Sequence, residues 1–439
     1  MSTPNQLTAT QAAGKLASGE LSAVELMEAC LARIAERESE VQAWTYLDSD
    51  RAMALAHEAD ALRASGKGIG PLHGLPVGIK DIIDTADMPT ENGSPMFTGR
   101  QTNHDAACVS ALRDAGAIIL GKTVTTELAN VFPGKTHNPH NPEYSPGGSS
   151  SGSAAGVADF HMPLALGTQT GGSVIRPASF CGIYGLKPTL GLISRAGVLM
   201  QSPTLDTVGV YGRSVDDLGL IADCLSARDP SDPVSFPRSR GHILSTSRHE
   251  PPTPPRLAFL RTPAWPHANV DAQEAILQLT NSLGDHCVEA SMPTPFDHIC
   301  DLHAQIMGPE DLAYYGDFLN NTPHLLSEPL KTRLKAATTT TATQYVNAQR
   351  QREIINTDFE ALLSRYDAVI CLSSASSAPR GLTSTGNAIF NGLWTYLGVP
   401  CVTLPKLEVD GMPMGVQLVG MRGDEGRLLR TARWLDGHI

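Results

Sequence analysis

Apolar residues along the chain fall into two patterns, which predict helices and strands respectively. In the first 65 residues they recur every three or four positions, which is typical of helices. Ser22 and Glu25 form a candidate capping box at the start of one such helix, and a second helix is expected over 50–64. Farther along, short apolar runs typical of buried strands alternate with helical patterns. The expected strands are 77–79, 117–120, 164–166, 257–260, 368–372, 401–404 and 414–419, and the expected helices are 106–115, 153–158 and 271–283.

This alternation of strands and helices predicts an α/β protein. We expect a mixed, largely parallel central sheet that is covered by helices on both faces. The composition changes at 229–256, which is rich in Pro, Ser and Arg and fits a domain linker or a long surface excursion equally well. Because strands and helices resume on both sides of it, we expect a single domain over 1–439.

Composition and charge exclude several classes of function. The 439 residues carry a formal net charge of −12, whereas proteins that bind nucleic acids or membrane surfaces normally have a basic face. The N-terminus lacks the basic and apolar regions of a signal peptide, and no apolar stretch is long enough for a membrane span. We therefore expect a cytoplasmic protein that binds neither nucleic acid nor membranes.

Cysteine and histidine spacing gives no sign of a metal site. The eight cysteines show no CxxC pattern and the 14 histidines no HExxH pattern, so neither a zinc site nor a disulfide framework is expected. Buried free thiols in a reducing compartment explain the cysteines better. The sequence predicts an enzyme that needs no metal and no cofactor.

The segment 146–188 carries the clearest candidate chemistry. Two Gly-Gly-Ser turns, 147–149 and 171–173, flank an expected helix and strand. Glycine allows close backbone approach, so such turns can aim several N–H groups at an oxyanion or a phosphate, or can mark a crowded packing site. A serine there can be both exposed and surrounded by donors, as a nucleophile requires. The strand at 164–166 argues against a flexible linker, and no phosphate-binding glycine motif is present.

Several motifs in this order resemble those of the amidase-signature family. GGSSSGSAAG, LGTQTGGS and FCGIYGLKPT are similar to the family's signature, and HGLPVGIKD at 73–81 resembles its lysine-bearing strand. FNGLWTYLGVPCVTLP and MGVQLVG resemble its C-terminal segments. The similarity runs from the N-terminal helix to near Arg430 and is weakest over 230–385. It implies the amidase-signature fold.

The resemblance implies a catalytic triad. Ser173 matches the nucleophile, Ser149 the bridging serine that precedes a cis peptide bond, and Lys80 the final base. A serine hydroxyl needs a base to take its proton, and lysine can serve only when it is neutral. Burial must therefore lower the pKa of Lys80 from about 10.4 to about 7. Lys80 ends the apolar run 75–79, but Asp81 and Asp84 would oppose this change if they face it.

The resemblance also implies an oxyanion hole and shows two departures from the family pattern. The expected donors are the backbone N–H groups of Thr170, Gly171, Gly172 and Ser173. The family more commonly has Asp where this chain has Gln169, and its Arg usually stands two positions after the nucleophile. Here Ile175 takes that place and Arg176 follows. We therefore expect the triad chemistry without the family's inherited substrate preference.

The expected function is hydrolysis of C–N bonds in small-molecule amides through an acyl-enzyme, with anilides, esters and carbamates as further candidate substrates. The enzyme is expected to act as a monomer or homodimer. The alternative is the glutaminase (A-type) subunit of a tRNA-dependent amidotransferase complex; a catalytically dead binding module is disfavoured because the whole triad is present. Variable loops, including 307–315 in the variable region of about 290–385 and the region around 389–394, are expected to build the substrate pocket. Met307, Ile389 and Trp394 are expected either to line it or to lie in the core.

Overall fold

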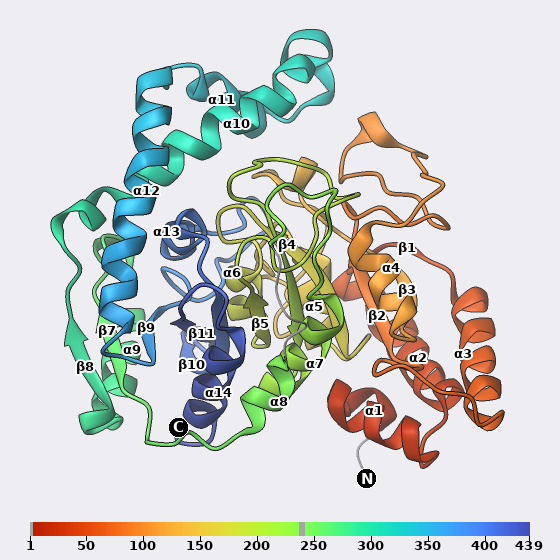
Figure 1. Cartoon of the computed structure of the whole chain (residues 1–439). Helices are drawn as coiled ribbons and strands as arrows, with labels where there is room; N and C mark the ends of the chain where they lie inside the picture. Colours follow the sequence, from red (N-terminus) through yellow and green to blue (C-terminus); the bar gives the residue numbers. More distant parts are fainter. Residues whose placement is uncertain (1–2, 237–241) are drawn as a thin grey trace.

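A single sheet of eleven strands runs through the computed structural model, which describes residues 3–236 and 242–439 (Figure 1). The strands, in chain order, are β1 (Trp44–Leu47), β2 (Pro76–Lys80), β3 (Ile118–Thr123), β4 (Leu164–Gln169), β5 (Tyr184–Lys187), β6 (Thr207–Gly212), β7 (Leu257–Leu260), β8 (Cys287–Ala290), β9 (Ala368–Leu372), β10 (Cys401–Val409) and β11 (Met412–Val419). Their order across the sheet is β1-β3-β2-β4-β6-β5-β10-β11-β9-β7-β8. Strands from the N-terminal and C-terminal parts of the chain therefore share one sheet.

The sheet is mixed, as predicted. Its parallel pairs form two groups, β3-β2-β4 and β9-β7-β8, and the strands between these groups pair antiparallel. Every residue of β2, β3, β4, β6 and β9 is buried. Side chains alternate between the two faces of a strand, so complete burial means that both faces are covered. The predicted α/β class is confirmed.

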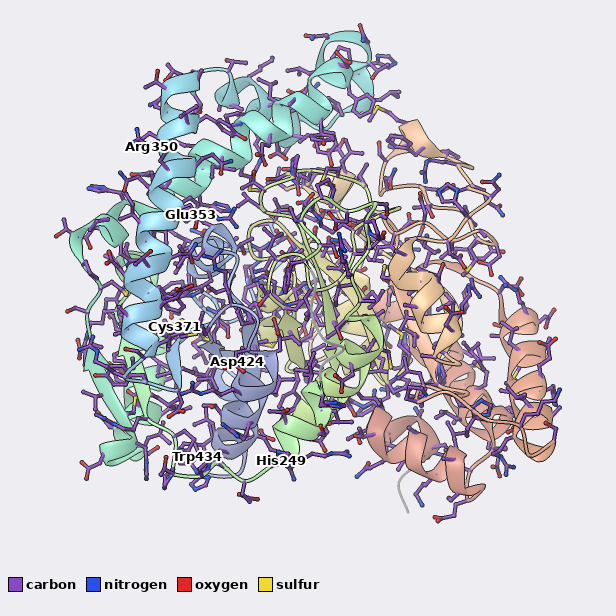
Figure 2. All side chains as sticks on the ribbon, in the orientation of Figure 1. His249, Arg350, Glu353, Cys371, Asp424 and Trp434 are labelled. Carbon is purple, nitrogen blue, oxygen red and sulfur yellow. The ribbon has the colours of Figure 1, made fainter. Side chains whose placement is uncertain are left out.

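Helices supply this cover. They are α1 (Ala9–Ser18), α2 (Ala23–Val41), α3 (Ser49–Ala64), α4 (Ala107–Asp114), α5 (Ser151–Ala158), α6 (Ile175–Phe180), α7 (Val215–Leu225), α8 (Ile243–Arg248), α9 (Val270–Ser282), α10 (Ile299–Asn321), α11 (Glu328–Ala337), α12 (Ala342–Leu363), α13 (Ile389–Leu397) and α14 (Glu425–Asp436). The capping box predicted at Ser22 and Glu25 begins α2. Side chains fill the space between the sheet and its helices (Figure 2).

The predicted elements all occur, most of them with shifted ends, whereas β1, β5, β6 and β8 were not predicted. The largest difference lies in 290–385. The segment 307–315, expected as a loop, is the middle of α10, and 389–394, just beyond this region, is the first part of α13. Together α10, α11 and α12 form a helical arm above the sheet (Figure 1). Residues of α10 and α11 line the candidate pocket together with the loop 384–388 and the start of α13.

The Pro- and Ser-rich stretch is anchored to the body where it is described; 237–241 lie outside the described residues. Asp232 forms a buried ion pair with Arg195, with 2.8 Å between Oδ1 and Nη2. After the gap, α8 packs against α7 and α14. Both described parts of this stretch therefore contact the rest of the protein.

Three further sequence-based expectations concern cysteines, metals and membranes. All eight cysteines are free thiols, and five of them, including Cys371 on β9 (labelled in Figure 2), are buried. Across residues 3–236 and 242–439, no three His, Cys, Asp or Glu side chains are arranged to hold a metal ion. None of the helices in these two ranges is both long and apolar enough to cross a membrane.

Candidate active site

The pairing of β2 with β4 brings the predicted site residues to one edge of the sheet. The two strands are parallel neighbours, with Ile79 opposite Leu166, so their C-terminal ends lie side by side. Lys80 is the last residue of β2, and the second Gly-Gly-Ser turn follows β4 directly. In sheets of this kind, ligands bind beyond the carboxyl ends of the parallel strands.

Lys80 and Ser149 are in direct contact. The Nζ of Lys80 lies 2.7 Å from Ser149 Oγ and 2.8 Å from Thr168 Oγ1. Lys80 and Ser149 are both buried, and the Gly148–Ser149 peptide is cis. The cis bond therefore precedes Ser149, whereas the sequence-based expectation placed it after this residue. An amine held between two hydroxyls can accept a proton from one of them when it is neutral.

Burial favours the neutral form of the Lys80 amine. It lowers the pKa of Lys80 well below its usual value, and the nearby Asp206 carboxylate partly opposes this effect. The acids that the sequence singled out are engaged elsewhere: Asp81 lies 3.7 Å from Lys122, and Asp84 pairs with Arg100 at 2.7 Å. The local environment thus provides the condition that a lysine base requires.

Asp206 is a residue that the sequence reasoning missed. Its carboxylate accepts hydrogen bonds from the Thr170 hydroxyl at 2.5 Å and from the backbone N–H groups of Gln201 and Ser202 at 2.7 and 2.9 Å. Burial nevertheless raises the pKa of Asp206 to about 6. Near neutral pH it is therefore a buried negative charge that contacts Thr170, at the start of the glycine turn, and acts electrostatically on Lys80.

Ser173 lies between β4 and α6 on the wall of a cavity of about 950 Å³. Gly171 and Gly172 line the same cavity, which is open enough for a small molecule. The Ser173 hydroxyl has no hydrogen-bond partner within the described ranges, so the predicted last link from Ser149 to Ser173 is not a hydrogen bond in this structure. Such contacts often form only when substrate is bound. A side chain at position 172 would not fit, because its Cβ would lie 2.4 Å from Asn391 Oδ1.

The predicted oxyanion donors share one property. No acceptor within residues 3–236 or 242–439 takes a hydrogen bond from the backbone N–H groups of Thr170, Gly171, Gly172 or Ser173. The next two N–H groups along the chain are satisfied differently: Gln169 Oε1 accepts from Val174 at 2.9 Å and from Ile175 at 3.0 Å. Gln169 thus caps the start of α6 and leaves the preceding turn free to bind a ligand.

Arg176 connects the two serine loops. Its Nη2 donates to Gly148 O at 2.6 Å and to Thr385 Oγ1 at 3.1 Å, and its guanidinium is buried at the cavity wall. Burial lowers the pKa of Arg176 to about 10, which still leaves it charged at neutral pH. Arg176, one position later than usual, therefore holds the carbonyl of the cis peptide itself.

The three predicted pocket residues separate into two groups. Met307 on α10 and Ile389 on α13 line the cavity. Trp394 does not: it is fully buried, and its ring packs 5.7 Å from that of Phe296 and 5.5 Å from that of Phe359. The expectation that Trp394 lines the pocket is wrong, because the face of α13 that carries it points into the core.

The fold and this constellation define an amidase-signature hydrolase, and the comparisons agree. The sequence model of the Amidase family matches residues 25–429, so the chain belongs to this family. It is a hydrolase that acts on amide C–N bonds.

Individual relatives match along nearly their whole length. An amidase from Pseudomonas putida is 38% identical, over 98% of this chain and 96% of that protein. The A-type subunit of the glutamyl-tRNA(Gln) amidotransferase of Chloroflexus aurantiacus is 32% identical, over 97% and 95%. One similar solved structure comes from work on a vestigial protein complex and the evolutionary origins of an s-triazine catabolic enzyme. It matches this chain with a TM-score of 0.91 and 29% identity, over 98% of each of the two chains.

Proposed function

We propose that this chain hydrolyses small-molecule amides through an acyl-enzyme on Ser173, with Ser149 and Lys80 carrying the proton. The observation that carries this proposal is the buried contact of 2.7 Å between Lys80 Nζ and Ser149 Oγ. It lies beneath a glycine turn that presents Ser173 to the cavity. The similarity to an amidase of Pseudomonas putida over nearly the whole chain supports the same reaction.

In the first half of the reaction, neutral Lys80 accepts the Ser149 proton while Ser149 takes the proton of Ser173. The Ser173 Oγ bonds to the substrate carbonyl carbon, and the unpaired N–H groups of the turn stabilise the resulting oxyanion. When the C–N bond breaks, the proton returns from Lys80 through Ser149 to the leaving nitrogen. The products of this half are an amine and an ester of Ser173.

In the second half, a water molecule replaces the amine. It loses its proton to the same Ser149–Lys80 path and attacks the ester carbonyl, and Ser173 regains a proton as the carboxylic acid leaves. The same steps cleave anilides, esters and carbamates, because each has a carbonyl carbon and a leaving group that fit this scheme. The cavity volume of about 950 Å³ supports a small-molecule substrate.

A glutaminase component of an amidotransferase is the second candidate, and the similarity to the A-type subunit of the glutamyl-tRNA(Gln) enzyme favours it. The two functions share the triad and differ in what the chain needs in order to work. A free-standing amidase turns over simple amides by itself, whereas a glutaminase subunit is expected to depend on the rest of its complex.

The test is turnover by the purified chain alone. Matched p-nitroanilide, p-nitrophenyl ester and carbamate substrates are assayed together with glutamine, using Ser173→Ala as the background control. Ser173-dependent cleavage of anilides without any partner supports the proposal. Activity on glutamine alone, and only after the partner proteins of such a complex are added, would instead identify the second function.

A further inference from the structure

We propose that His303 and Thr395 are positioning residues that clamp two peptide planes of the nucleophile turn, so that the N–H groups of Gly171 and Gly172 face the cavity. This inference rests on the proposed function, since it concerns the oxyanion hole of that reaction. His303 belongs to α10 and Thr395 to α13, far from the turn along the chain.

Peptide geometry links each carbonyl to the next N–H. In a planar trans peptide, the C=O of one residue and the N–H of the next point in opposite directions. Whatever holds the carbonyl of Thr170 therefore also sets the direction of the Gly171 N–H, and the carbonyl of Gly171 sets that of Gly172. Glycines have no side chain to restrict such a plane, so an external anchor has a large effect at these two positions.

His303 anchors the first plane. Its Nε2 lies 3.0 Å from Thr170 O, and a carbonyl oxygen can only accept, so Nε2 carries the proton. Burial lowers the pKa of His303 to about 4, which keeps the ring neutral near pH 7. In this tautomer, Nε2 is a fixed donor and Nδ1 is an acceptor.

Thr395 anchors the second plane. Its hydroxyl lies 2.8 Å from Gly171 O and receives a hydrogen bond of 2.9 Å from Gln169 Nε2. The orientation of the Gln169 amide is fixed, because its oxygen already accepts two backbone N–H groups. Since Gln169 donates to Thr395, the hydroxyl proton is left for a carbonyl, with Gly171 O nearer than the alternative Asn391 O at 3.2 Å.

This direction of hydrogen bonding gives a reason for glutamine at position 169. A carboxylate there could still accept the N–H groups at the start of α6, but it could not donate to Thr395. It would instead attract the Thr395 proton, and Gly171 O would lose its donor. The amide thus both caps α6 and orients the clamp.

The test measures kcat and KM for a matched p-nitroanilide and p-nitrophenyl ester with the same acyl group. His303→Leu and Thr395→Val each remove one anchor, while His303→Gln and Thr395→Ser keep a donor. Gln169→Glu tests the clamp without removing either residue. Thr431→Val on α14, another buried threonine, is the matched control. Thermal unfolding of each variant confirms the fold.

We expect His303→Leu, Thr395→Val and Gln169→Glu to lower kcat by about 10- to 100-fold, less than the roughly 10²- to 10³-fold that follows direct loss of an oxyanion donor. KM should change little, and amide and ester should lose equally, because both form an oxyanion. The donor-retaining variants and Thr431→Val should stay within a few-fold of wild type.

Unchanged kcat in folded His303→Leu and Thr395→Val would overturn the clamp, as would losses confined to KM or a Thr395→Ser variant no better than Thr395→Val. If Thr395→Val does not fold, unchanged kcat in Gln169→Glu has the same meaning. If the proposed function itself is wrong, the result is distinguishable, because Ser173→Ala then retains activity.

Discussion

The Nζ of Lys80 and the Oγ of Ser149 are 2.7 Å apart in a buried site, and no carboxylate of the described ranges forms an ion pair with this amine. Most buried lysines are stabilised by an opposite charge. Here the partners are hydroxyls of Ser149 and Thr168, and the nearest relevant charge, Asp206, acts only at longer range. The site therefore favours the neutral amine, which is the form that a base needs.

The first prediction concerns the charge on Asp206. Because its carboxylate opposes the lowered pKa of Lys80, Asp206→Asn should lower that pKa further. The acid limb of kcat/KM against pH should then move to lower pH, since neutral Lys80 forms earlier as pH rises. Asp84→Asn serves as the control, because Asp84 pairs with Arg100. An acid limb that stays in place in Asp206→Asn would show that Lys80 does not titrate in the active range.

The second prediction concerns stability. Lys80 has a lower pKa in the folded than in the unfolded chain, so the unfolded chain binds more protons and Lys80 destabilises the fold below its unfolded pKa of about 10.4. Lys80→Met should therefore be inactive but unfold at a temperature a few degrees higher near pH 7. Thermal unfolding from pH 6 to 10.5 should show this advantage shrinking as pH rises. If the unfolding temperature of Lys80→Met instead rises relative to that of the wild type as pH increases, Lys80 is buried as a stabilising cation.

The third prediction concerns the proton path. Lys80→Ala and Ser149→Ala should each reduce kcat/KM on an amide by about 10²- to 10⁴-fold, and the double variant should lose little more than either. A path that is interrupted at one residue gains nothing from the other. Esters should lose less than amides, because an alkoxide leaves without a proton. Losses that multiply, and that are equal for both substrates, would mean that the two residues act independently.

The fourth prediction concerns the acyl pocket. Met307→Ala enlarges the cavity, so kcat/KM should fall by about 10-fold or more for short acyl chains and hold or rise for longer ones. A series of p-nitroanilides with increasing acyl length measures this. Trp394→Phe is the control: it should lower the unfolding temperature without changing chain-length preference, because Trp394 lies in the core. The same preference in Met307→Ala and wild type would place the acyl group elsewhere.

Strand and helix predictions succeeded where a segment carries its own signal. The runs 257–260 and 368–372 are continuous, apolar and buried, and they form β7 and β9 with the predicted bounds. Strands β5 and β6 were missed because glycines interrupt their apolar runs. In α10, Gly308 and Pro309 lie mid-helix, and the buried face includes Glu310 and Asp311, so an apolar helical pattern is absent.

The candidate site shows the same contrast between residues with a local sequence signal and residues without one. Lys80, Ser149 and Ser173 belong to local motifs, and the resemblance of these motifs to the amidase-signature family is what predicts their roles. Asp206 and His303 reach the site only through tertiary contacts, and no motif in their own segments marks them. Gln169 was noticed as a departure, but its donor role became clear only with Thr395 beside it.

The most direct test of the proposed mechanism is amide turnover by Ser173→Ala, purified and shown to be folded by its thermal unfolding. Ser173 is presented to the cavity by the turn after β4, and the change removes one oxygen while leaving the Lys80–Ser149 contact in place. With a p-nitroanilide that the wild-type chain cleaves, we expect kcat/KM to fall by at least about 10³-fold, with the unfolding temperature nearly unchanged. Turnover close to that of the wild type would contradict the assignment of Ser173 as the nucleophile.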